Sequence, residues 1–95
     1  VGYLPDNLVF TPNGNVLLVA NEGEPLDNYT ADPEGSVSYI NLSRGINLIS
    51  QQDVTNIGFE SVMKDSNVII KNGAEQKNDF EPEYIVVDKN SQYAY

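Results

Sequence analysis

The chain has 95 residues, enough for one small domain, and its apolar fraction of 40% is typical of folded proteins. Fourteen acidic residues against five basic ones give a formal net charge of −9, which excludes nucleic acid and anionic membrane surfaces as partners. Cysteine and histidine are absent, so disulfides, thiolate nucleophiles and imidazole bases or ligands are excluded.

A hairpin is predicted near the start of the chain. Two apolar runs flank Asn13-Gly14, and these two residue types tolerate the positive φ that a tight hairpin turn requires. Pro12 stands at the entrance of the turn, where its missing N–H does not interrupt a strand ladder. The pattern predicts strands at residues 7–11 and 16–21.

Two further strands are predicted after a long acidic loop. Residues 22–35 contain two prolines, two glycines and five acidic residues, and loops of this length inside compact domains are often functional. Residues 36–42 alternate between apolar and polar side chains, which predicts a third strand. A turn at Arg44-Gly45 leads to a predicted fourth strand at residues 46–54. Four consecutive antiparallel strands form a meander, which is one blade of a β-propeller.

The pattern changes in the middle of the chain. Residues 58–64 place three apolar side chains at helical spacing and predict a short helix. Residues 68–70 are an apolar β-type run, and residues 72–79 are polar and predict a loop. We therefore expect a short irregular or helical insertion between two regular parts.

The end of the chain repeats its beginning at an offset of 77 residues. Residues 5–18 align with residues 82–95 without a gap, so that Leu8 meets Ile85. A proline followed by an acidic residue precedes the first strand in both copies. Two unrelated hairpins would share the apolar–turn–apolar pattern, but the matching entrance favours a repeat. Repeated β-meanders indicate propellers or similar arrays, whose units are usually about 40–50 residues long, so the spacing implies an insertion.

We therefore expect an all-β fold, an antiparallel meander amounting to about one and a half propeller blades. Residues 1–54 would form the first four-stranded blade, residues 55–80 an insertion or connector, and residues 81–95 the truncated start of the next blade. A strand beginning at residue 93 has no room to finish, which indicates a piece of a larger repetitive protein. Unpaired strand edges of this kind promote self-association.

Three segments carry a resemblance to a known family: LPDNLVFTPNGNVLLVANEGEP (residues 4–25), YTADPEGSVSYINL (residues 29–42) and DFEPEYIVV (residues 79–87). Through them the chain resembles the choice-of-anchor I family, proteins similar to the so-called mesenchyme-specific cell surface glycoprotein and often labelled alkaline phosphatase-like. The resemblance implies a β-propeller of several blades and an extracellular, periplasmic or cell-surface location. Residues 55–78 match the family least.

Acidic side chains in two segments form the candidate metal site. The candidates are Glu22, Glu24, Asp32, Glu34, Glu81 and Glu83. Loops on one rim of a propeller converge near its central channel, so the two segments could meet there. Ligands that are all oxygen suit Ca²⁺, although no EF-hand spacing is present. The alternative is that these residues brace loops and keep the surface soluble.

Two functions remain open at this point. The first is a non-catalytic secreted or cell-surface module that binds a small-molecule or protein ligand, with Ca²⁺ as the one expected cofactor. The second, which the resemblance implies, is part of a metal-dependent phosphoesterase, alkaline phosphatase-like or phytase-like, whose active site needs the full propeller. Such an enzyme usually needs cationic groups to hold phosphate, and no Lys or Arg precedes Arg44. No residue is proposed as catalytic. No apolar run approaches the roughly 20 residues of a membrane helix, so membrane insertion is not expected.

Overall fold

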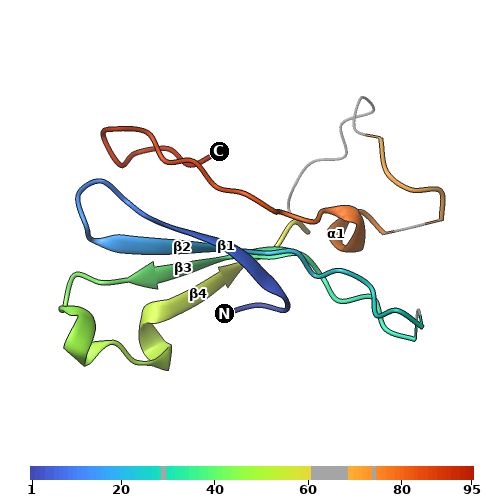
Figure 1. The fold of residues 1–95 in the computed structure, drawn as a ribbon, viewed down its shortest axis with the longest axis horizontal. Coiled ribbons are helices and arrows are strands. Elements are labelled where there is room, and N and C mark those ends of the chain that lie inside the picture. The colour runs from blue at the N-terminus through green and yellow to red at the C-terminus, as the bar shows by residue number, and fades with distance from the viewer. Residues whose placement is uncertain (29, 61–68, 74) are drawn as a thin grey trace.

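The computed structural model describes residues 1–28, 30–60, 69–73 and 75–95. Its strands and α-helix are β1 (Pro5–Phe10), β2 (Val16–Asn21), β3 (Ser36–Asn41), β4 (Val54–Ile57) and α1 (Gln76–Asp79). The four strands form one antiparallel sheet in chain order, β1-β2-β3-β4 (Figure 1). The expected all-β fold and its antiparallel meander are therefore confirmed. The division into residues 1–54, 55–80 and 81–95 stays a prediction.

The first hairpin forms where the Asn-Gly pair predicted it. Gly14 has a φ of 74°, a conformation that costs glycine nothing and most other residues about 1 kcal/mol or more. The Thr11 N–H donates to the Val16 carbonyl at 2.9 Å, and the Thr11 hydroxyl accepts the Val16 N–H at 3.0 Å. The Asn13 side chain accepts the Asn15 N–H at 3.0 Å. The turn is thus held by both backbone and side-chain bonds.

The fourth strand begins at Val54, so the strand predicted at residues 46–54 is wrong. Residues 46–53 contain two short 3₁₀ turns, Ile46–Leu48 and Gln51–Asp53. In the second turn the Asp53 carboxylate accepts the Ser50 N–H at 2.8 Å and the Ser50 hydroxyl at 3.0 Å. These local bonds compete with strand pairing, which explains why an alternating sequence does not extend here.

The connector differs from the prediction in its described part. The helix predicted at residues 58–64 lies mostly outside the described residues, and residues 69 and 70 are not in a strand. The loop predicted at residues 72–79 contains the single helical turn α1. The Asn78 and Asp79 N–H groups both donate to the Glu75 carbonyl, at 3.0 and 3.2 Å. A helix of one turn leaves no periodic signal in a sequence.

The core lies between the sheet and the C-terminal segment. Leu18 and Ala20 of β2 are buried together with Ile85, and half-buried valines of β1, β2, β3 and the C-terminal segment pack around them. The Ile85 N–H donates to the Asn7 side chain at 3.3 Å, which ties the C-terminal segment to β1. Figure 1 shows this segment, in red, running beside the β1–β2 hairpin.

The C-terminal segment repeats the pairing of the first hairpin at the offset of 77 residues. Phe10 pairs with Leu17 in the first hairpin, and 77 positions later Val87 pairs with Ala94. The register of the two hairpins is therefore the same, as the predicted internal repeat requires, and the repeat stays a prediction. The paired part of the second hairpin is shorter, because Val87 and Ala94 form an isolated bridge outside the four named strands.

The turns of the two hairpins also match. The Thr11 N–H donates to the carbonyl five positions later at 2.9 Å, and the Asp88 N–H does the same at 2.9 Å. Ser91 stands at the position of Gly14 and has a φ of 59°, in the same left-handed region. The turns lie side by side, since the Asn13 N–H donates to the Ser91 hydroxyl at 3.1 Å. The two hairpins therefore lie next to each other with turns of the same geometry.

A buried polar network occupies the other face of the sheet. The fully buried Asn21 donates its side-chain N–H to the Ser38 hydroxyl at 2.9 Å, and that hydroxyl donates to Asn56 at 2.6 Å. The Ser38 hydroxyl also accepts the Gly2 N–H at 3.1 Å. These side chains come from β2, β3 and β4, so the network ties three strands together in one register. The Asn21 Oδ1 is buried and has no hydrogen-bond partner among the described residues.

Candidate functional site

The candidate site begins where β2 leaves the sheet. The Glu22 N–H donates to the Leu4 carbonyl at 3.0 Å, and the Gly23 N–H donates to the Tyr3 carbonyl at 3.3 Å. Gly23 has a φ of 71°, and a Cβ there would lie 2.5 Å from the Glu34 carbonyl carbon. The chain after β2 is therefore held against both the N-terminal segment and the far end of the acidic loop. This fixes the backbone that carries Glu22.

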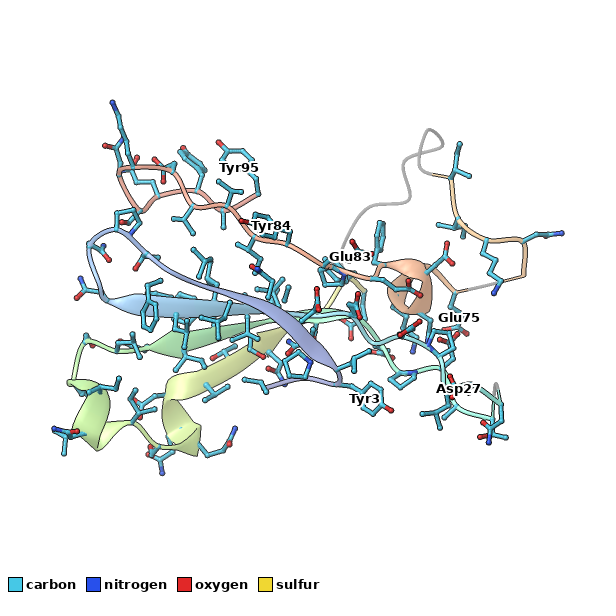
Figure 2. The ribbon with its side chains drawn as sticks, in the orientation of Figure 1. Tyr3, Asp27, Glu75, Glu83, Tyr84 and Tyr95 are labelled. Carbon is cyan, nitrogen blue, oxygen red and sulfur yellow. The ribbon has the colours of Figure 1, made fainter. Side chains whose placement is uncertain are left out.

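Five carboxylates gather at this end of the sheet, which we call the acidic end. They are Asp6, Glu22, Glu24, Glu81 and Glu83. Partial burial raises the pKa of Glu22, and the negative charges of the other four carboxylates raise it further. Figure 2 shows Glu83 on the segment that leads from α1 back over the sheet. Of the predicted residues, Glu24, Glu81 and Glu83 thus lie near enough for their charges to act on Glu22.

The other two predicted residues, Asp32 and Glu34, anchor α1 to the acidic loop. The Lys77 Nζ lies 2.5 Å from the Glu34 carboxylate and 3.5 Å from that of Glu75. The hydrogen bond and charge of Glu34 raise the pKa of Lys77. The Asn78 side chain donates to the Asp32 carbonyl. Through these contacts Asp32 and Glu34 brace the acidic loop against α1. Loop bracing is the role that the sequence analysis gave as the alternative to a metal site.

A polar cleft of about 250 Å³ lies between the acidic loop and α1. Its walls include Asp32, Asp79, Glu81 and Lys71. The Asp79 carboxylate accepts the Lys71 N–H at 2.6 Å, so this acid holds backbone. Among the residues that the structure describes, no group of three or more carboxylates lies close enough to hold a metal ion. A cation at the acidic end would therefore rely on one or two carboxylates and on backbone carbonyls or water.

Sequence reasoning missed two contributors to this region, Asp6 and Lys77. Asp6 could have been found, because the offset of 77 residues places Asp6 on Glu83, and both acids follow a proline. Lys77 could not have been found, since its ion pair with Glu34 depends on a helical turn that no sequence pattern indicates.

Comparison with known proteins identifies the family. The family model described as the choice-of-anchor I domain matches residues 1–95. No curated protein and no solved structure matches the chain. In the described ranges, no helix is both long enough and apolar enough to cross a membrane. The family match spans every segment that carried the resemblance in the sequence. The chain therefore belongs to the choice-of-anchor I domain family and is a domain of the cell-surface-associated type.

Proposed function

We propose that this domain is a non-catalytic binding module of a surface or extracellular protein, and that its acidic end binds Ca²⁺. The observation that carries the proposal is the set of four carboxylates, Asp6, Glu24, Glu81 and Glu83, whose charges act on the half-buried Glu22. Three separate segments hold like charges around a partly buried carboxylate, which is unfavourable for the folded state unless a cation is present. Groups with perturbed pKa values are concentrated at functional sites, and hard cations prefer oxygen ligands.

The arrangement of the carboxylates at the acidic end favours weak binding of Ca²⁺. Because no three described carboxylates are close enough to surround a metal together, backbone carbonyls and water would complete the coordination shell. Calcium sites of extracellular modules have dissociation constants of about 0.1–1 mM. We expect an affinity in this range, matched to a compartment where Ca²⁺ is abundant.

A phosphoesterase, the alternative function, would use the same carboxylates together with further groups. It also needs cationic groups that hold the phosphate of the substrate. Arg44 lies 3.5 Å from Asp53, and Lys77 is engaged with Glu34 and Glu75. These two cations are engaged with carboxylates, but Lys71 lines the polar cleft beside Asp79 and Glu81, so the phosphoesterase is kept as the second candidate function.

Calcium titration of the melting temperature tests the proposal. Ten times the dissociation constant of Ca²⁺ should stabilise the domain by about 1.4 kcal/mol, and EDTA should reverse the effect. The Glu22→Gln/Glu83→Gln double variant should lose the response. Glu75→Gln is the matched control, since Glu75 precedes α1 and its nearest ion partner is Lys77 (Figure 2). Equal melting temperatures in EDTA and in 10 mM Ca²⁺ would rule out the calcium site.

A further inference from the structure

The chain contains two Asn-Gly pairs, Asn13-Gly14 and Asn72-Gly73. This dipeptide changes chemically without an enzyme, which is one reason why asparagine is thermolabile. The Gly nitrogen, after losing its proton to the solvent, attacks the side-chain carbonyl carbon of Asn, and ammonia leaves as a succinimide ring closes. Water then opens the ring and leaves aspartate or isoaspartate. Glycine permits the attack because it has no side chain beside the nitrogen.

Hydrogen bonds hold the first pair in a protected form, although both of its residues are exposed. The Gly14 N–H donates to the Thr11 carbonyl at 2.8 Å, so the nitrogen must give up this bond before it can attack. The Asn13 Oδ1 accepts the Asn15 N–H at 3.0 Å and lies 2.8 Å from the Thr11 hydroxyl. The Asn13 N–H donates to the Ser91 hydroxyl of the second hairpin at 3.1 Å. Reaction at Asn13 therefore requires the turn to open.

The second pair, Asn72-Gly73, lies in the turn before α1. Both residues are exposed, and Gly73 has a φ of 87°. Within the described ranges, no hydrogen bond engages the Asn72 side chain or the Gly73 N–H. Asn72 also lines the polar cleft, together with Asp32, Asp79 and Glu81. Reaction at Asn72 therefore breaks no hydrogen bond between described residues.

We infer that Asn72 is a site of spontaneous deamidation, and that Asn13, which is followed by the same residue, is protected from it by the fold. The product replaces a neutral amide at the wall of the polar cleft by a carboxylate, beside Asp32, Asp79 and Glu81. The isoaspartate form also lengthens the backbone by one methylene just before α1. The modification is therefore slow and irreversible, and it makes the polar cleft more acidic.

Mass spectrometry of the aged chain tests the inference. The folded chain is kept at mildly alkaline pH in EDTA and then cut, at mildly acidic pH, by a protease that cleaves after glutamate. The two pairs fall in separate peptides, residues 1–22 and residues 61–75, and fragmentation locates the changed residue in each. The gain of about one dalton at Asn72 should be at least about tenfold faster than at Asn13, since tenfold corresponds to about 1.4 kcal/mol for opening the first turn. In concentrated urea the two rates should approach each other.

Gly73→Ala is the matched variant, because its methyl group hinders the attacking nitrogen and should slow the gain at Asn72 while leaving Asn13 unchanged. Three results would overturn the inference. One is equal rates at the two pairs in the folded chain. Another is an Asn72 that reacts in urea but keeps its mass in the folded chain. The third is a gain at Asn72 that is as fast in Gly73→Ala as in the parent chain. Because EDTA is present throughout, each of these results leaves the calcium proposal standing.

Discussion

Ile85→Ala should destabilise the chain by about 2–3 kcal/mol. Replacing a buried Ile by Ala costs about 2–5 kcal/mol, depending on how well the surroundings collapse. Ile85 is 6% exposed and belongs to a small cluster with Leu18 and Ala20. An open cleft of about 410 Å³ borders this cluster between the sheet and the second hairpin, and its walls include Leu18 and Val87. Solvent can enter from that cleft, which places the expected loss in the lower half of the range.

Urea denaturation followed by circular dichroism measures this loss. With a slope of about 1–2 kcal/mol per molar urea for a small domain, the midpoint should fall by roughly 1–3 M. Val86→Ala is the matched control, because its side chain is 53% exposed and its loss should change stability by less than about 0.5 kcal/mol. Equal midpoints for the two variants would refute the reasoning, because the second hairpin would then not be packed on the sheet.

Two further substitutions test the polar network and the acidic end. Ser38→Ala removes a hydroxyl that bonds Asn21 and Asn56, and the unsatisfied amides should lower stability by about 1–3 kcal/mol in urea melts; an unchanged midpoint would contradict the network. Glu22→Gln should raise the melting temperature at pH 7 without Ca²⁺. The raised pKa of Glu22 means that its ionisation disfavours the folded state. The difference from the parent chain should therefore be full above the raised pKa, shrink as the pH falls through it, and vanish below the ordinary value of 4.5. A pH-independent difference would contradict the coupling among the carboxylates.

The regular parts of the fold could be predicted from sequence because local signals and tertiary packing agree there. Asn13-Gly14 and its flanking apolar runs specify the first hairpin, and the structure has β1 and β2 within two residues of the predicted bounds. At residues 46–53 the local sequence signal and the tertiary packing disagree. The alternation looks like a strand, but Ile46 and Leu48 are exposed, and the Ser50–Asp53 bonds hold a turn instead.

The candidate site could be predicted to the extent that the repeat defines it. Glu81 and Glu83 stand at the entrance of the second hairpin, which the repeat places beside the first, so their approach to Glu22 follows from the sequence. Asp32 and Glu34 lie in the same acidic loop as Glu22 but are engaged with α1. Their separation depends on that single helical turn, which forms through tertiary contacts and leaves no sequence pattern.

The central claim is that the second hairpin resembles the first and packs on the face of the sheet that carries Leu18 and Ala20. Proton–proton contacts in the NMR spectrum of the chain test this claim most directly. We predict cross-peaks between Ile85 and both Leu18 and Ala20, together with cross-strand contacts between Val87 and Ala94. Cross-peaks from Ile85 to Leu8 or Phe10, on the opposite face, would contradict this stacking. So would a C-terminal segment that shows no long-range contacts.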